Sequence, residues 1–151
     1  ITLNRQSMLI DTNLIIYAIN SASPKHEQAK QFLTQEHHSL VVADQNILEA
    51  LRVLTHAKFS HPMTFSRAEK AVDGIASASK IVAPTEETLP IARALMHKYA
   101  RAANRIFDAY LVATMLTHAI GEIATDNERD FKVFKEIMVT NPFRSTGMRT
   151  H

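Results

Sequence analysis

The sequence predicts a single α/β domain with a central parallel sheet of about four to five short strands flanked by helices. Short apolar runs alternate along the chain with longer segments whose apolar residues recur at helical spacing. No repeat, low-complexity tract or linker interrupts this alternation. Apolar residues make up 46% of the 151 residues, which is enough for the one core that a chain of this length is expected to form.

The predicted strands are the short apolar runs. They comprise residues 8–10, 40–43, 81–83, 123–125 and 137–139. Each run has the length of a buried strand, and strands that alternate with helices are typical of a parallel sheet covered on both faces.

The predicted helices lie around these strands, at residues 13–20, 23–36, 44–56, 66–79, 85–99 and 108–119. Leu48 in the third helix and Leu89 in the fifth belong to apolar stripes that we expect to face the core. Gly121 follows the last and most apolar helix, and we expect it to end that helix as a C-terminal cap.

The folded domain is predicted to span residues 8–143. Residues 1–7 precede Met8 and are interpreted as a leader, with Met8 as the natural start. The polar residues 144–151 are expected to form a tail. No apolar run approaches the roughly 18 residues needed to cross a bilayer, so we expect no membrane span.

Composition excludes several kinds of site. The chain contains no cysteine, which rules out disulfides, thiolate zinc sites and a cysteine nucleophile, and which is compatible with a reducing cytosol. With only three glycines it cannot build a glycine-rich phosphate loop. The net charge of +2 is mildly basic and leaves nucleic acid as one option among several.

Four acidic residues fall where ligands bind in such folds. Asp11 and Asp126 directly follow predicted strands, and the carboxyl ends of parallel strands meet at one edge of the sheet. Asp108 heads an apolar helix, whereas Glu49 lies opposite the centre of the apolar stripe of its helix. Each also has a simpler interpretation. In it Asp11 and Asp108 are helix caps, Glu49 is a solvated helix residue and Asp126 is part of a turn.

Carboxylates that converge repel one another, and a bound cation relieves that repulsion. Oxygen ligands favour a hard ion such as Mg²⁺ or Mn²⁺. Such an ion orients a phosphodiester, activates a water and stabilises the leaving oxygen. If the four acids share one site, metal-dependent hydrolysis of a phosphodiester is therefore the chemistry that follows.

Four segments resemble, in order, the motifs of PIN-domain ribonucleases. The first is residues 8–13, where a strand ends in Asp-x-Asn, and the second is residues 46–52, which resemble the second acidic motif. The third is residues 107–113, where an Asp-Ala pair opens an apolar helix, and the fourth is residues 125–131, which end in Asp-Phe. The resemblance covers about residues 8–143. Residues 139–143 also resemble the end of one bacterial and archaeal toxin subgroup.

The resemblance implies a small PIN-like α/β domain that binds Mg²⁺ or Mn²⁺ and cuts RNA. Small stand-alone members are mostly VapC-like toxins of toxin–antitoxin pairs, typically homodimers held inactive by a cognate antitoxin. It therefore predicts a cytoplasmic endoribonuclease toxin of a type II pair. The alternatives are a PIN nuclease that processes RNA without an antitoxin and a catalytically silent α/β binding module.

The resemblance also assigns roles to single residues. Asp11 and Asp108 resemble the principal metal ligands, and Glu49 resembles a further ligand or a carboxylate behind them. The predicted polar supports of these acids are Asn13, Thr125 and Asn127.

The fourth acid is where the sequence departs from the family pattern, because Asn127 stands where some relatives carry Asp. We expect Asp126 to be the fourth catalytic and metal-binding residue, since it is nearest the strand end. Asp130 is the alternative.

Basic residues near these motifs are candidates for contacts with RNA, because phosphate contacts supply most non-specific affinity. They are Arg52, Lys98, Arg101 and Arg105. The alternative for the last three is a solvated helix end, where cations favour the helix dipole.

Overall fold

The computed structural model describes residues 3–36, 38–99 and 105–144. Its centre is one five-stranded sheet of order β3-β2-β1-β4-β5, in which every pair of neighbouring strands is parallel. The strands are β1 (Asn4–Ile10), β2 (Ser39–Ala43), β3 (Lys80–Val82), β4 (Ile120–Ala124) and β5 (Met138–Thr140). The predicted parallel α/β sheet is therefore confirmed.

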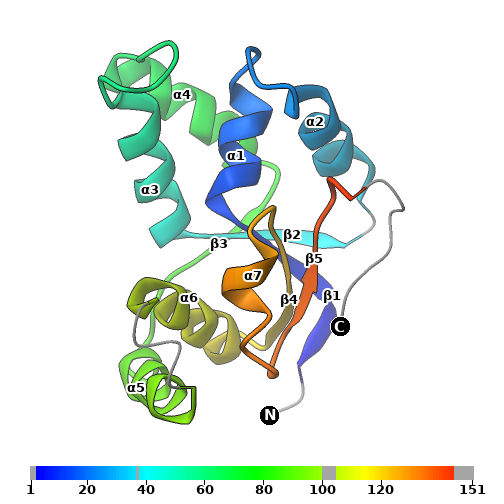
Figure 1. Ribbon diagram of the computed structural model, residues 1–151, viewed down its shortest axis with the longest axis vertical. Coiled ribbons are helices and arrows are strands. Elements are labelled where there is room, and N and C mark those ends of the chain that lie inside the picture. The colour runs from blue at the N-terminus through cyan, green and yellow to red at the C-terminus, as the bar shows by residue number, and fades with distance from the viewer. Residues whose placement is uncertain (1–2, 37, 100–104, 145–151) are drawn as a thin grey trace.

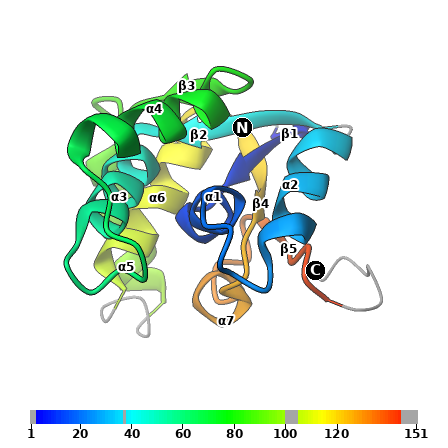
Figure 2. The ribbon, with the colours of Figure 1, turned by 90° about the horizontal axis from the view of Figure 1, so that it is seen from above.

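Seven helices within the described residues cover the sheet. They are α1 (Thr12–Ile19), α2 (His26–Gln35), α3 (Asp44–Thr55), α4 (Phe65–Ala76), α5 (Thr88–Lys98), α6 (Ile106–Thr117) and the single turn α7 (Glu128–Phe131). Figure 1 shows α1 to α4 in the upper half of the view and α5 and α6 in the lower half. Seen from above in Figure 2, α1 lies between α2 and α3, both of which it contacts.

The helices form two layers because side chains alternate along each strand. Met8 and Ile10 of β1 pack with residues of α1, α3 and α4 on one face of the sheet. Leu9, between them, packs with residues of α5 and α6 on the other face. The central strand is thus buried on both sides, as its unbroken apolar sequence predicts.

β1 begins earlier than the sequence pattern predicts. It pairs with β4 at Asn4 and Ile120 as well as further along. Leu3 packs closely on Gly121, since a Cβ atom on that glycine would lie 3.1 Å from Cβ of Leu3. Residues 4–7, which the sequence analysis left outside the domain, are therefore part of the sheet.

Two further expectations about the ends of helices are corrected. Gly121 lies inside β4 and does not cap the preceding helix, which ends at Thr117. The left-handed backbone position after that helix belongs to Ala119, with a φ of 57°. Glycine at 121 serves close packing against the first strand instead.

The orientation of α3 also differs from the prediction. Leu48, expected to face the core, is 67% exposed, and Leu89 of α5 is 54% exposed. The buried face of α3 carries Asn46, Ala50 and Leu54 instead. This rotation turns a polar side chain inward at the carboxyl end of the sheet. The reason for it lies in the site described below.

In the described part of the chain every helix is too short or too polar to span a bilayer.

Candidate active site

Asp11 lies where the chain leaves β1 and enters α1. Its backbone N–H donates to the carbonyl of Ala124 at 3.0 Å, which continues the pairing of β1 with β4 past the strand end. Its side chain caps α1 by accepting a hydrogen bond from the N–H of Thr12 at 2.9 Å. The carboxylate is 8% exposed. Asp11 is therefore both a helix cap and a buried acid at the edge where ligands bind in such sheets.

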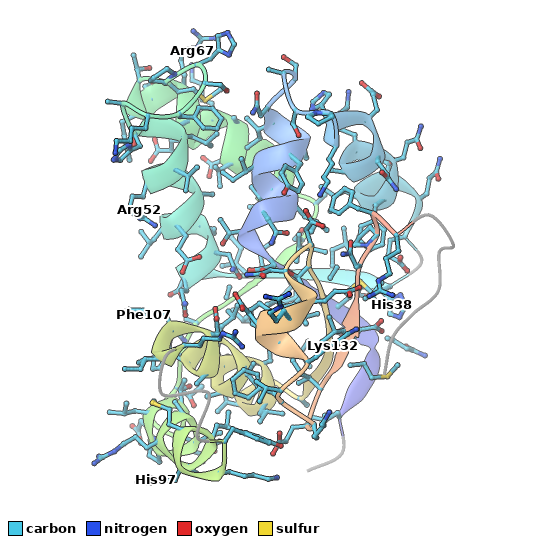
Figure 3. All side chains as sticks on the ribbon, in the orientation of Figure 1. His38, Arg52, Arg67, His97, Phe107 and Lys132 are labelled. Carbon is cyan, nitrogen blue, oxygen red and sulfur yellow. The ribbon has the colours of Figure 1, made fainter. Side chains whose placement is uncertain are left out.

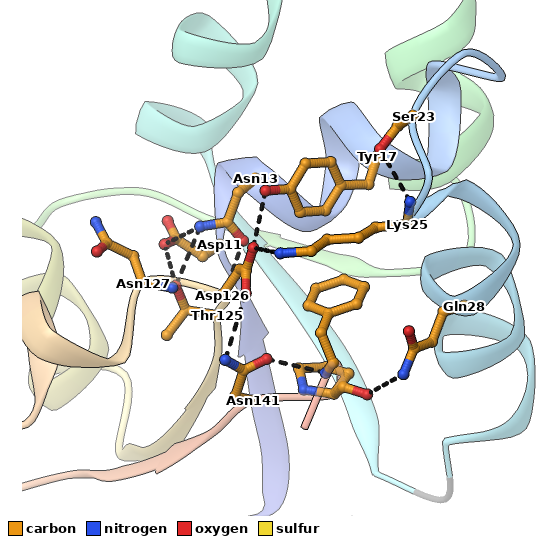
Figure 4. Close-up of polar contacts among 12 residues, drawn as sticks. Asp11, Asn13, Tyr17, Ser23, Lys25, Gln28, Thr125, Asp126, Asn127 and Asn141 are labelled. Atoms are coloured by element: carbon orange, nitrogen blue, oxygen red, sulfur yellow. Dashed lines mark hydrogen bonds and ion pairs between the residues drawn. The ribbon is translucent and has the colours of Figure 1, made fainter. Parts of the chain in front are cut away.

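Side chains from distant parts of the chain hold this carboxylate. Its Oδ2 accepts hydrogen bonds from the hydroxyl of Thr125 at 2.7 Å and from Nδ2 of Asn13 at 3.3 Å. Figure 4 shows both contacts. Its Oδ1 accepts a longer bond of 3.5 Å from Nδ2 of Asn46. Neutral donors thus fix the orientation of Asp11 without supplying a positive charge.

Asn46 explains the rotation of α3. Its side chain is fully buried, and its Oδ1 accepts from the N–H of Ala43 at 3.3 Å. Its Nδ2 also donates to the hydroxyl of Thr12 at 3.1 Å, which in turn donates to Glu49 at 2.9 Å. Sequence reasoning assigned no role to Asn46 or Thr12. The signal that was available was an amide and a hydroxyl inside motif segments, next to acids.

Glu49 of α3 and Asp108 of α6 line the same cleft. Gln45 connects the two helices, because its Nε2 donates to Oε1 of Glu49 at 3.3 Å and to the carbonyl of Phe107 at 3.1 Å. Asp108 follows in the first turn of α6 and accepts no hydrogen bond from the described residues. A cleft of about 350 Å³ is lined by Asp11, Asn13, Glu49, Asp108 and Asn127, among others.

The electrostatics of the cleft disfavour the ionised form of its acids. Burial raises the pKa of Asp11 to about 6, and the charges of Glu49 and Asp130 add to this effect, while the hydrogen bonds from Thr125 and Thr12 oppose it. Burial also raises the pKa of Asp108 to about 6, with contributions from Asp130, Asp11 and Glu49. The charges of Glu49 and Asp130 are therefore close enough to Asp11 and Asp108 to disfavour the ionised forms of these two acids.

Asp130 takes part in this cluster from α7. One of its oxygens pairs with Nε of Arg105 at 3.0 Å, and the other accepts a short hydrogen bond from the side chain of Asn127. Its charge nevertheless reaches both Asp11 and Asp108, whose pKa values it raises.

Asp126, the expected fourth acid, faces a different part of the molecule. It pairs with Lys25 at 2.5 Å and accepts hydrogen bonds from the hydroxyl of Tyr17 at 2.8 Å and from Asn141 at 3.3 Å (Figure 4). Burial alone would raise the pKa of Asp126, but these bonds and the charge of Lys25 bring that pKa below its ordinary value. The structure thus brings Asp11, Glu49 and Asp108 together and leaves Asp126 outside their cleft.

The polar supports lie where the sequence analysis expects them to act. Thr125 is fully buried and donates to Asp11 while accepting from the N–H of Asn127 at 2.9 Å. Asn13 donates to Thr125 at 3.2 Å, and its Oδ1 accepts from the N–H of Asp126 at 3.1 Å. The three supports therefore form one connected network around a single acid.

The donor set suits a hard divalent cation. No group of three or more His, Cys, Asp or Glu side chains within residues 3–36, 38–99 and 105–144 is placed so that it could hold a metal ion by itself. Mg²⁺ does not require such a group, because it keeps several waters and usually binds one or two carboxylates together with substrate phosphates. Asp11 and Asp108 face the cleft and carry raised pKa values, which is the chemistry that such an ion relieves.

The four basic candidates are scattered. Arg105 pairs with Asp130 beside the cleft, and Arg52 lies exposed on α3 next to it. Lys98 points elsewhere, because it pairs with Glu136 at 2.7 Å. Arg101 lies outside the described residues.

Comparisons with known proteins identify the family of the chain. The PIN domain family model matches residues 8–137. Ribonuclease VapC48 of Mycobacterium tuberculosis is 28% identical over 143 residues, which cover 91% of this chain and 98% of the relative. Ribonuclease VapC24 of the same organism is 26% identical over 145 residues, with the same coverage of both chains.

Solved structures share the fold. A toxin–antitoxin complex from Klebsiella pneumoniae matches with a TM-score of 0.66 at 21% identity, over 91% of this chain and 98% of that chain. VapC20 of Mycobacterium tuberculosis, a toxin that cleaves the sarcin–ricin loop, matches with a TM-score of 0.62 at 18% identity, over 86% and 98%. Because the family model matches most of the sequence, this chain belongs to the PIN domain family.

Proposed function

We propose that this chain is a VapC-like endoribonuclease that uses a divalent metal ion, Mg²⁺ or Mn²⁺, to hydrolyse phosphodiester bonds of RNA. The observation that carries the proposal is the cleft in which Asp11 and Asp108 lie together, each with a pKa of about 6. Relatives named as ribonucleases, aligned over nearly the whole chain, support the substrate.

The proposal gives each acid a task. Asp11 and Asp108 are the metal ligands, and Glu49 adds negative charge from α3, where Thr12 and Gln45 hold its two oxygens. When bound, the ion supplies an activated water and neutralises charge on the scissile phosphate. The hydrogen bonds from Thr125 and Asn13 keep Asp11 in one orientation as the metal and substrate arrive.

We also propose Asp130 as the fourth acid of the site, in place of Asp126. Asp130 interacts electrostatically with both Asp11 and Asp108 although it also pairs with Arg105, whereas Asp126 pairs with Lys25 outside the cleft that holds them. Asp126 then acts as a structural residue at the end of β4.

The biological context follows from the relatives. We propose that the chain is the toxin of a toxin–antitoxin pair, acts in the cytoplasm, forms a homodimer and is inhibited by a cognate antitoxin. A toxin–antitoxin complex among the structural neighbours supports this assignment.

The test is cleavage of a mixed RNA pool by the wild-type chain with Mg²⁺, with EDTA, and by Asp108→Asn with Mg²⁺. We expect cutting in the first reaction only. Asp126→Asn serves as the comparison and should retain Mn²⁺ binding and most of the cleavage, whereas Asp130→Asn should weaken both. A folded wild-type chain that neither cuts RNA nor binds Mn²⁺ would contradict the proposal. Loss of Mn²⁺ binding in Asp126→Asn alone would reverse the assignment of the fourth acid.

A further inference from the structure

Two cationic cavities adjoin the acidic cleft, one on each side. The first, of about 900 Å³, lies along α7, and its charged lining residues are four cations, Arg105, Arg129, Lys132 and Lys135, and two acids, Asp126 and Glu128, both of which are ion-paired. The second, of about 300 Å³, lies at the end of α3 and is lined by Arg52, Val53, His56, Lys58 and Phe59. We call them the α7 cavity and the α3 cavity.

Both cavities border the cleft, because each shares one lining residue with it. Asn127 lines the cleft and the α7 cavity, and Val53 lines the cleft and the α3 cavity. A chain molecule that leaves the cleft past either residue therefore enters a cationic surface. Figure 3 labels Arg52 on α3 and Lys132 beside α7, the two elements from which these surfaces come.

Several of these cations have no partner of their own. In the α7 cavity Arg105 pairs with Asp130 and Lys132 pairs with Glu128 at 3.4 Å. The side chains of Arg129 and Lys135 form no ion pair or hydrogen bond with the described residues, and both are exposed. Their charge is therefore free to act on a ligand.

The α3 cavity also carries cations without an ion-pair partner among the described residues. Arg52 and Lys58 are exposed, and neither side chain pairs with an acid within the part of the chain that the structure describes. No acidic residue is among those that line this cavity. His56 accepts the N–H of Lys58 on its Nδ1 at 3.0 Å, which leaves its Nε2 to donate. The polar side chains that line this cavity are thus two cations and one neutral donor, beside the apolar Val53 and Phe59.

Cations on either side of an acidic cleft are suited to binding an RNA strand. An acidic centre repels a polyanion, so a nuclease of this kind must hold the strand by phosphates on either side of the one it cuts. With a net charge of only +2, the chain cannot attract RNA over its whole surface. The arrangement cation–acid–cation concentrates attraction along one line through the cleft.

We infer that the RNA backbone crosses the cleft from the α3 cavity to the α7 cavity, with Arg52 and Lys58 holding phosphates on one side of the cut and Arg129 and Lys135 holding phosphates on the other. This inference rests on the proposed function, and it adds Lys58, Arg129 and Lys135 to Arg52, which the sequence already suggests as an RNA contact.

The test measures binding apart from cleavage. Asp108→Asn protein in EDTA is titrated with a fluorescein-labelled, random-sequence, single-stranded 20-nucleotide RNA at several salt concentrations. In this background the double variants Arg129→Ala/Lys135→Ala and Arg52→Ala/Lys58→Ala should each weaken RNA binding about tenfold. Each should also make the slope of log affinity against log salt concentration less steep by about 1.4, because each lost phosphate contact contributes about 0.7. Arg129→Lys/Lys135→Arg, which keeps both charges, should bind as the parent does.

The matched control removes two charges elsewhere. Arg67 and Lys70 are exposed on α4 and line none of the three cavities, and Figure 3 shows Arg67 away from Lys132. Arg67→Ala/Lys70→Ala should leave the affinity within about twofold. Circular dichroism checks that each variant folds, which is expected because every replaced side chain is exposed.

The outcomes separate the two proposals. If the wild-type chain cuts RNA but both cavity variants bind as the α4 control does, the path is wrong and the nuclease assignment stands. If only one cavity variant loses affinity, the two-sided path is wrong. A parent protein that does not bind the RNA, together with a wild-type chain that does not cut it, overturns both proposals.

Discussion

At the scale of single residues, the site is built at the expense of stability. Asp108 is partly buried, accepts no hydrogen bond from the described residues and faces other carboxylates, so its ionised form is unfavourable without a cation. Asp11 is more deeply buried but has several hydrogen-bond donors. The two ligands therefore differ in how much of their charge the protein already compensates.

We expect Asp108→Asn to stabilise the metal-free protein at pH 7. The substitution removes one charge from a cluster of like charges, and because the side chain is partly exposed the gain should be about 1 kcal/mol. Urea unfolding in EDTA measures it, with Asp73→Asn on the exposed side of α4 as the control. Equal unfolding free energies for Asp108→Asn and wild type would show that the cluster is not strained.

The stability of the metal-free protein should depend on pH for the same reason. The pKa values of Asp11 and Asp108 in the folded chain are about 6, above the 3.8 of an unperturbed carboxyl. The folded state therefore binds protons more readily than the unfolded state between pH 4 and 7, and these two groups make the metal-free protein more stable as the pH falls through that range. For Asp11 the difference corresponds to about 3 kcal/mol at pH 7.

Other carboxyls titrate in the same range, so the comparison between variants is the decisive measurement. The advantage of Asp108→Asn over wild type should shrink as the pH is lowered from 7 to 4.5 in EDTA. An advantage that stays constant over this range would mean that the pKa of Asp108 is not raised.

At the scale of elements, Asp126 connects three segments. Lys25, in the turn before α2, pairs with it and also lies 5.5 Å from the ring centre of Tyr17 and 5.2 Å from that of Phe143. The two rings meet edge to face with their centres 5.3 Å apart. The end of β4, the α1–α2 turn and the segment after β5 are thereby held together (Figure 4).

We expect Lys25→Met to loosen this junction. Loss of the ion pair and of the cation–π contacts should cost about 1 kcal/mol, and amide hydrogen exchange should accelerate near residues 23–26 and 141–143. Lys30→Met on the exposed face of α2 is the control. Unchanged exchange in both segments would show that the junction does not hold them.

The same junction shows which features can be predicted from the sequence and which cannot. The apolar runs predict the strands and their parallel arrangement in one sheet. The motifs predict the positions of Asp11, Glu49 and Asp108 in the chain. The place of Asp126 does not, because proximity to a strand end says nothing of the direction of a side chain. Its cation lies 101 residues away along the chain, and only the fold brings the two together.

The helix α3 illustrates a second limit of prediction from the sequence. Hydrophobic periodicity placed Leu48 toward the core, yet Leu48 is exposed and the polar Asn46 is fully buried. Periodicity counts apolar side chains and has no means of weighing a buried amide that satisfies Ala43, Thr12 and Asp11 at once.

At the scale of the whole molecule, a bound metal should stabilise the fold. Mn²⁺ binding to Asp11 and Asp108 acts only on the folded state, so at about 100 times the dissociation constant it should add about 2.7 kcal/mol and raise Tm by several degrees. Differential scanning fluorimetry with and without EDTA measures the shift. Asp108→Asn should show little of it, and a wild-type Tm that does not respond to Mn²⁺ would argue against a metal site in the cleft.

The hydrogen bond from Thr125 to Asp11 joins residues 114 positions apart. Until the chain has been synthesised beyond β4, the first aspartate has neither this donor nor the strand beside it, and the acids from α6 and α7 are not yet in place. A nascent chain that does not yet extend beyond β4 and α7 therefore lacks the assembled cleft while it is surrounded by RNA. For an enzyme whose proposed substrate is RNA, activity then begins only after these late elements have been synthesised, when an antitoxin already present can bind the folded domain.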